Sequence, residues 1–238
     1  AHFLTSDIPR NSRRAGGGIG PAIVGTLIIT GAAALMAIPL GVLGAIYLNE
    51  FGKQSLFART VRFMSDVMTG VPSIVMGLFI YLIWVVRVKE QTGLAGAFAL
   101  ACLILPIVIR STEEMLKLVP QDQRQASMAV GARTWRTTFS VVLPGAMAGI
   151  VSGSMLAIAR AAGETAPLIF VAGVAFERNA SLSGPNTALP ALIFRNASEP
   201  FAAAQERAWG AALTLVVIVF VFTVLARVVA RRFNVGNR

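Results

Sequence analysis

Long stretches without a charged residue recur along the chain and indicate its architecture. Uncharged runs of about 20 residues or more lie between Arg14 and Glu50, Asp66 and Arg87, Glu90 and Arg110, Arg136 and Arg160, and Arg207 and Arg227. A helix of about 20 apolar residues spans the hydrocarbon core of a bilayer. The runs are continuously apolar and rich in Gly and Ala, whereas a membrane β-barrel alternates apolar and polar residues. The pattern therefore predicts an all-α integral membrane protein, a polytopic helical bundle with five spans.

Composition supports this fold class and narrows the chemistry. Hydrophobic residues make up 55% of the 238 residues and charged residues 13%, which is too apolar for an ordinary soluble domain. A formal net charge of +10 would suit nucleic-acid binding, but most basic residues flank the apolar runs, as membrane topology requires. We therefore expect contact with lipid and not with nucleic acid. The single His2 has no Cys, His or carboxylate at ligand spacing, so we expect no metal site, and the lone Cys102 predicts no disulfide within the chain.

The basic residues also predict the orientation of the spans. The C-terminal end is basic and carries no acid, which places it and the tail 233–238 in the cytoplasm; its arginines are Arg227, Arg231, Arg232 and Arg238. Counting back through the domain 20–232 places the connection 49–66 and the loop 111–140 in the cytoplasm. The loop 177–207, where acids and bases balance, then lies outside.

Residues 1–19 fall outside in this scheme, and their basic residues conflict with that placement. Arg10, Arg13 and Arg14 favour the cytoplasm by the positive-inside tendency. The chain starts with AHFLTSDIPR, without Met or a signal peptide, so we expect an earlier span to precede this sequence. The RRAGGG stretch is then a flexible external loop.

The stretch VPQDQRQASMAVGARTWRTTFSVVLPGAMAG, residues 119–149, predicts a helix-turn-helix outside the membrane. Pro120 suits the first turn of a helix, and Gly131 suits the left-handed residue that ends one. A second segment, 133–142, leads to Pro144, where the next span is expected to begin. Such an element docks on a cytoplasmic partner, and the alternative is an ordinary amphipathic loop. Trp135 and Phe139 share a helical face and predict a hydrophobic patch that packs on the membrane domain or on a partner.

The stretch RAAGET, residues 160–165, places two charges inside an apolar segment. Arg160 and Glu164 are four residues apart, so on a helix they share a face and form a salt bridge. If the span begins near Gly145, Arg160 lies about 22 Å along it, inside a core of roughly 30 Å. Gly163 and Pro167 flank the pair, and a kink there opens backbone groups toward a cavity.

Two interpretations of this pair stay open. It is either a structural bridge that locks helix packing, or Arg160 attracts an anion while Glu164 holds its side chain, since a guanidinium suits tetrahedral oxyanions. Arg110 is a second candidate on the anion pathway, with anchoring at the membrane edge as its alternative. Glu113 and Glu114 are expected in solvated coupling structure.

Two glycine-containing stretches bear on the pathway and on ATP. The stretch MTGVPS, residues 68–73, interrupts an apolar run with Gly70 and Pro72, which predicts either a pathway-lining break or a packing kink. The stretch GGGIGP lacks the GK[ST] ending of a phosphate cradle, so we expect no ATP site in this chain.

The predicted helix-turn-helix resembles the cytoplasmic motif of membrane subunits of ATP-binding-cassette (ABC) importers. That motif is Glu-Ala-Ala, three residues, Gly, nine residues, then Ile-x-Leu-Pro. At that spacing this chain has Gln125, Ala126, Ser127, Gly131, Val141, Leu143 and Pro144. The resemblance implies a coupling helix that sits in a cleft of an ATPase subunit, and Gln125 in place of Glu removes a charge from that contact.

Longer stretches resemble the permeases of ATP-driven phosphate importers, which are type I ABC importers. These stretches are AIVGTLIITGAAALMAIPLGVLGAIYLNEF, MTGVPSIVMGLF, LPIVIRSTEEMLKLVPQDQRQASMAVGARTW and ARAAGETAPLIF. The resemblance implies one half of a translocation pathway for inorganic phosphate in the bacterial cytoplasmic membrane, with no catalytic residue and no cofactor in this chain. It also implies as partners a second homologous permease, ATP-binding subunits that carry ATP and Mg, and an extracytoplasmic phosphate-binding protein.

Two points qualify this resemblance. Members of the family usually have six spans, so the five expected here agree with an earlier first span. A permease for another oxyanion, such as molybdate or sulfate, and an anion channel subunit stay open as alternative functions.

Overall fold

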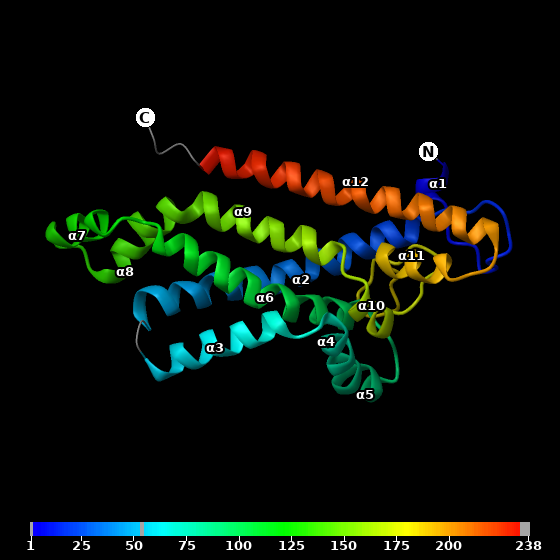
Figure 1. The fold of residues 1–238 in the computed structure, drawn as a ribbon, viewed down its shortest axis with the longest axis horizontal. Coiled ribbons are helices and arrows are strands. Elements are labelled where there is room, and N and C mark those ends of the chain that lie inside the picture. The colour runs from blue at the N-terminus through cyan, green and yellow to red at the C-terminus, as the bar shows by residue number, and fades with distance from the viewer. Residues whose placement is uncertain (1, 53–54, 234–238) are drawn as a thin grey trace. The chain divides into compact units, whose positions relative to one another are not determined.

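The computed structural model describes residues 2–52 and 55–233, which fold into helices without a strand (Figure 1). In chain order the helices are α1 (His2–Thr5), α2 (Gly20–Ile46), η1 (Tyr47–Phe51), α3 (Leu56–Gly70), α4 (Ser73–Ile80), η2 (Tyr81–Val85), α5 (Val86–Val88), α6 (Gly93–Lys117), α7 (Gln121–Ala129), α8 (Thr134–Thr137), η3 (Thr138–Val142), α9 (Leu143–Ala162), α10 (Ala166–Val171), α11 (Leu189–Ala197) and α12 (Ala202–Phe233). The segments η1, η2 and η3 are π-helical. The predicted all-α fold class is confirmed, while Lys53 and the tail 234–238, with Arg238, lie outside the described residues.

Several of these helices are long and apolar enough to cross a membrane. The continuous ones are Gly20–Phe51, Gly93–Lys117, Thr134–Ala162 and Ala202–Arg232. A further candidate is the pair Leu56–Gly70 and Ser73–Val88, whose two halves are bent by 106°. The five predicted spans correspond to the four continuous helices and this bent pair, counted as one span.

The bend lies in the stretch 68–73, where the sequence predicted an interruption. Helix α3 ends at Gly70 and α4 begins at Ser73, while Pro72 between them has an extended backbone, with φ −58° and ψ 135°. Proline has no N–H to donate and forces the preceding residue out of the helical conformation, so one α-helix cannot continue through this point. The predicted interruption is confirmed.

Helix α3 itself was not predicted, because residues 49–66 were expected to be a connection. The helix begins at Leu56 and carries Arg59, Arg62 and Asp66 along one face. Neighbouring positions are apolar and exposed; they are Leu56, Phe57, Phe63, Met64 and Val67. The span prediction depends on long runs without a charge. The charged face of this amphipathic helix interrupts such a run, so the charge pattern did not predict the helix.

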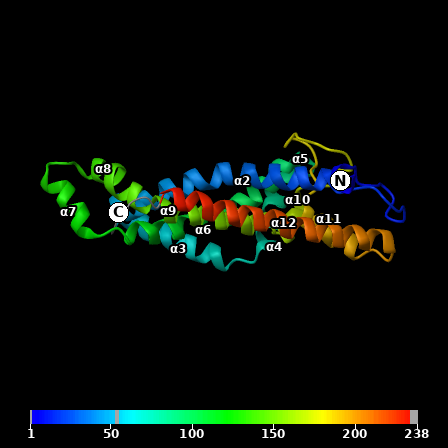
Figure 2. The ribbon, with the colours of Figure 1, turned by 90° about the horizontal axis from the view of Figure 1, so that it is seen from above.

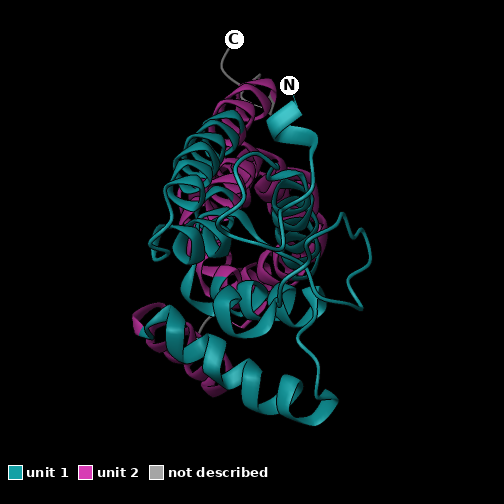
Figure 3. Ribbon diagram, turned by 90° about the vertical axis from the view of Figure 1, so that its right-hand side faces the viewer, with its two compact units in different colours: residues 1–36, 71–103, 159–221 teal, residues 37–70, 104–158, 222–238 magenta. Residues whose placement is uncertain are grey.

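One compact unit consists of residues 1–36, 71–103 and 159–221, drawn in teal in Figure 3. Apolar clusters of described residues form its core. One contains Ile8, Ile19, Ala22, Leu189, Leu192 and Ala211, and another contains Ile80, Val85, Ala95, Ala99 and Val171. Many of these residues are alanines, which let neighbouring membrane helices approach closely.

Residues 2–19 belong to this unit, and hydrogen bonds hold them in place. Arg207, only 4% exposed, donates to the carbonyl oxygens of Ser12, Arg14 and Gly16 at 2.8, 2.8 and 3.3 Å. Ile8 and Ile19 are buried in the first apolar cluster. The structure thus differs from the expected flexible loop, because a buried guanidinium satisfies the backbone carbonyls that a flexible loop turns to water.

The second unit consists of residues 37–70, 104–158 and 222–238, drawn in magenta in Figure 3. Its larger apolar cluster contains Ile46, Leu116, Val119, Val142, Ala146 and Ile150, and a smaller one contains Ala45, Leu48, Ala58 and Ile109. Helices α2, α6, α9 and α12 contribute residues to both units. The helix-turn-helix therefore belongs to a unit with a core of its own.

The number of membrane crossings predicts on which side of the membrane the two ends lie. If the bent pair crosses once, the crossings between Ala15 and Arg232 are odd in number, and these exposed positions face opposite sides. We expect a membrane-impermeant thiol reagent to label Ala15→Cys in intact cells, and Arg232→Cys only after permeabilisation, both with Cys102 replaced by Ala. Labelling of both positions in intact cells would show that the bent pair re-enters the same side.

Candidate functional site

The helix-turn-helix is formed by α7 and α8, which lie side by side in Figures 1 and 2. Pro120 precedes α7 with φ −56° and ψ 141°, and Asp122 lies in the first turn, where the helix dipole favours a negative charge. Gly131 has φ +87°, and its N–H donates to the carbonyl of Met128 at 2.9 Å. The predicted helix start and left-handed glycine are both confirmed.

The prediction that a second segment ends where a span begins at Pro144 is wrong. Residues 134–162 form one continuous helix, in which η3 joins α8 to α9. Pro144 lies in the first turn of α9, directly after the π-helical segment. The wider π turn accommodates a residue that has no N–H and whose ring crowds the preceding turn. The turn at Gly131 therefore lies only three residues before the start of a continuous helix long enough to cross the membrane.

Apolar side chains are exposed around this turn. Val130 is 85% exposed and Trp135 56%, and Met128 and Phe139 are also exposed. Exposed apolar surface beside polar residues is typical of a protein-interaction site. The predicted hydrophobic patch is thus present, and within the described residues Trp135 and Phe139 stay largely uncovered.

The residues of the importer motif lie on both sides of the turn. Gln125 and Ala126 are exposed on α7, whereas Ser127 is half-buried and its Oγ lies 3.0 Å from Oγ1 of Thr137 on α8. Val141 and Leu143 are half-buried and Pro144 is exposed, and Leu143 packs against the larger cluster of the second unit. Ser127 therefore fastens the two helices together, while Gln125 and Ala126 face outward.

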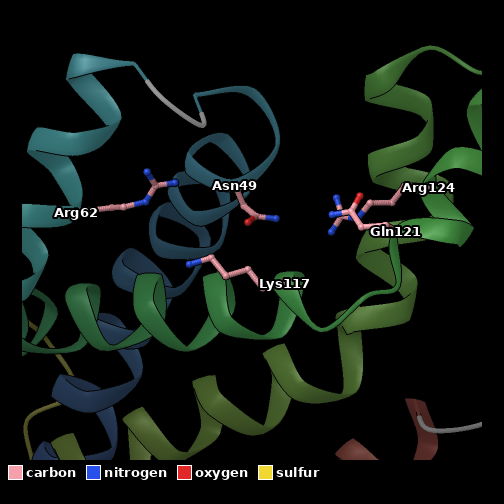
Figure 4. Close-up of a pocket in the computed structure, with 5 residues that line it drawn as sticks. All are labelled: Asn49, Arg62, Lys117, Gln121 and Arg124. Carbon is pink, nitrogen blue, oxygen red and sulfur yellow. The ribbon is translucent and has the colours of Figure 1, made fainter.

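Sequence reasoning missed a charged site on the membrane side of α7. A pocket of about 270 Å³ is lined by Asn49, Arg62, Lys117, Gln121 and Arg124 (Figure 4). The figure shows Arg124 and Gln121 pointing from α7 toward Asn49, and Arg62 pointing toward it from α3.

The most buried pair at this site joins Arg124 to Glu50, whose side chains are 8% and 5% exposed. Removing one partner of a buried ion pair destabilises a protein by about 3–5 kcal/mol, because the other charge is left unpaired. The pair is thus a fixed part of this unit. The sequence offered one signal for this pair: Glu50 is an acid at the end of an apolar run, whereas most residues that flank these runs are bases.

Arg160 lies in the last turn of α9, and Glu164 lies in the break that follows this helix. Helix α9 ends at Ala162, Gly163 follows, and α10 begins at Ala166 with Pro167 in its first turn. The expected kink is confirmed as a complete break. The expected shared helix face is wrong, because Glu164 lies beyond the end of α9. Arg160 Nε and Glu164 Oε1 are 3.7 Å apart, and their side chains are 68% and 20% exposed.

Close packing fixes the start of α10 next to this pair. Gly77 of α4 lies against Pro167, so closely that a Cβ at position 77 would be 2.5 Å from the proline Cα. Arg160 is the more accessible member of the pair. A guanidinium that is largely exposed and only loosely paired retains donors for a tetrahedral anion.

The other candidate residues lie in the second unit. Arg110 on α6 pairs with Asp66 on α3, with Nε and Oδ1 3.1 Å apart and both side chains about half exposed. Glu114 is exposed, as expected for solvated structure, but Glu113 is only 1% exposed and pairs with Arg62 and Lys117. The expectation of a solvated Glu113 is therefore wrong, because Glu113 is buried and paired with Arg62 of α3 and with Lys117 one turn further along α6.

Comparison with known proteins identifies the class. Residues 37–235 match the family model described as the binding-protein-dependent transport system inner membrane component. A chain of the MetNI methionine ABC transporter in an inward-facing conformation superimposes with a TM-score of 0.69 at 19% identity, covering 91% of this chain and 94% of that chain. A chain of a bacterial ABC transporter involved in the import of the polysaccharide alginate gives a TM-score of 0.65 at 13% identity, covering 91% of this chain and 79% of that chain. The fold is that of ABC importer membrane subunits.

Curated relatives narrow this class. A protein of Yersinia pestis named phosphate transport system permease protein PstA is 43% identical over 96% of this chain and 77% of its own length. A Mycobacterium tuberculosis protein named phosphate transport system permease protein PstA 1 is 43% identical over 90% of this chain and 70% of its own. The chain belongs to the binding-protein-dependent transport inner membrane component family, within the group of permeases named PstA.

Proposed function

We propose that this chain forms one half of a heterodimeric pathway that moves inorganic phosphate into the cell. The observation that carries the proposal is the 43% identity, over 96% of the chain, to a relative named as a phosphate transport system permease. A second homologous permease supplies the other half of the pathway. The complex lies in the bacterial cytoplasmic membrane, and an extracytoplasmic phosphate-binding protein delivers the anion.

ATP hydrolysis belongs to separate ATP-binding subunits, which carry ATP and Mg, and this chain makes no covalent bond. Closure of those subunits moves α7, and the continuous helix 134–162 passes the movement toward the pathway. The left-handed turn at Gly131 and the exposed apolar surface at Val130 and Trp135 support docking of this element on a partner. A simple anion channel has no need of such a surface.

Arg160 attracts the anion, and Glu164 limits how tightly it is held. Arg160 is 68% exposed in this chain, and it lies in the last turn of α9, next to the helix break. A carboxylate 3.7 Å from the guanidinium moderates its field, so the site binds phosphate and still releases it. Arg110 remains a second candidate on the same pathway.

The substrate is tested with the purified complex. We expect a tagged form of this chain to co-purify with an ATP-binding subunit and a second permease. In proteoliposomes this complex takes up radiolabelled phosphate only with ATP and the binding protein, and about a tenfold excess of sulfate or molybdate leaves uptake unchanged, because partners built for one oxyanion reject another. Competition by sulfate or molybdate identifies a different oxyanion permease, and uptake without ATP identifies a channel.

A further inference from the structure

Arg124 joins the coupling element to the ends of two membrane helices. Its Nη1 contacts both carboxylate oxygens of Glu50, at 2.5 and 2.7 Å, and its Nη2 donates to the carbonyl of Leu116 at 2.7 Å. Glu50 belongs to η1, which continues α2, and Leu116 lies in the last turn of α6. One side chain of α7 therefore holds two helices whose residues are far apart in the sequence.

Arg62 makes the equivalent link from α3. Its Nη2 donates to the carbonyl of Leu48 in η1 at 2.6 Å, and its Nε donates to Oε1 of Glu113 in α6 at 2.8 Å. Glu113 is 1% exposed and also pairs with Lys117 Nζ at 3.1 Å. The end of α2 and the end of α6 are thus tied to each other twice, once through α3 and once through α7.

The chemistry of these links suits a permanent connection. The last carbonyls of a helix have no partner within it, and cations near a helix C-terminus are favoured by its dipole. Each arginine here donates both to a carbonyl at a helix end and to a carboxylate, so more than one N–H group of its planar guanidinium is used. Both arginines contact the π-helical η1, a rare conformation often found at functional sites.

We propose that Arg62 and Arg124, together the arginine clasp, are positioning residues that make α7 and the ends of α2 and α6 move as one body. A displacement of α7 by an ATP-binding subunit then reaches the pathway through these two helices, in addition to the continuous helix 134–162. The direction of this coupling rests on the proposed function, whereas the rigid connection does not. Lysine at position 124 keeps the charge that Glu50 needs, but a single ammonium cannot span the carboxylate and the Leu116 carbonyl in the same way.

A distance measurement tests the rigid connection without reference to the substrate. Spin labels are placed at Glu114→Cys on α6 and Gln123→Cys on α7, both exposed, with Cys102 replaced by Ala. In the whole complex we expect one narrow distance distribution, identical in the nucleotide-free and the ATP-trapped states. With Arg124→Lys we expect the distribution to broaden. A distance that changes between the two states while Arg124 is intact would overturn the proposal.

A transport measurement tests the consequence. We expect Arg124→Lys and Arg62→Lys to lower the phosphate moved per ATP hydrolysed by about tenfold, within the usual range of coupling between sites, while each assembled complex still hydrolyses ATP. The matched control is Arg59→Lys, an exposed position on the same helix as Arg62, which should leave this ratio unchanged. If the clasp variants only reduce the amount of assembled complex and keep the wild-type ratio, the clasp is structural and the proposal fails. If the wild-type complex moves no phosphate, the proposed substrate is wrong, and the distance measurement still decides on the clasp.

Discussion

We expect Arg160→Gln to lower phosphate uptake by about 100-fold or more in a complex that still assembles. Hydrogen bonds to a charged group contribute about 1.5–3 kcal/mol each, and a guanidinium that meets an oxyanion through two of them loses both. Each 1.4 kcal/mol is a tenfold change, so the expected loss follows from two such bonds. The measurement is uptake of radiolabelled phosphate, normalised to the amount of assembled complex.

Assembly should survive this substitution because the ion pair is weak and accessible. Arg160 is 68% exposed and its Nε lies 3.7 Å from the Glu164 carboxylate, a distance beyond an ordinary hydrogen bond. Exposed ion pairs contribute about 0–1 kcal/mol. The glutamine amide therefore removes the positive charge that binds phosphate and does not leave Glu164 as a fully buried charge. A loss of uptake in this variant is then a loss of function and not of folding.

Further variants separate the two roles of the pair. Arg160→Lys should restore uptake only in part, since an ammonium keeps the charge and loses the planar fork. The control is Arg87→Gln, which removes an exposed arginine from α5 of the same unit. If Arg160→Gln takes up phosphate normally, or if Arg160→Glu combined with Glu164→Arg does so, the charges hold helices together and do not handle the substrate.

Features that depend on neighbouring residues were predictable from the sequence. The apolar runs predict the membrane helices, Pro120 and Gly131 predict the limits of α7, and Gly163 with Pro167 predicts the break after α9. Each of these follows from local backbone chemistry: a missing donor, a positive φ, or a run of apolar side chains. The resemblance of residues 125–144 to the importer motif depends on spacing alone and is equally local.

Features that depend on tertiary pairing were not predictable. Arg124 and Glu50 are 74 positions apart, and Arg62 and Glu113 are 51 apart, so no periodicity connects them. The same charges also concealed α3, because Arg62 and Asp66 interrupt an apolar run and only the folded chain shows that both are paired. Continuity of residues 134–162 through Pro144 was missed for a related reason, since a π-helical turn has no recognised sequence signal.

We expect Gly131→Val to lower phosphate uptake and the stimulation of ATP hydrolysis together, by about tenfold each. Gly131 has φ +87°, a conformation that costs a β-branched residue roughly 1–2 kcal/mol or more. A Cβ at this position meets no atom within 4 Å, so the effect arises from the backbone and not from a clash. The strained turn shifts α7 relative to α8 and misplaces the surface that docks on the ATP-binding subunit. A loss of about 1.4 kcal/mol in the free energy of docking corresponds to the tenfold change.

Two control variants isolate the backbone effect. Gly31→Val makes the same change in α2, where a Cβ also meets nothing within 4 Å and φ is not positive, and it should leave both activities near the wild-type level. Gly131→Asn should retain more activity than Gly131→Val, since asparagine adopts the left-handed conformation more readily. Both activities are measured in the same proteoliposomes and normalised to assembled complex. Normal uptake together with normal stimulation in Gly131→Val would show that the turn does not position a docking surface, whereas a loss of uptake alone would place its effect on the pathway and not at the ATP-binding subunit.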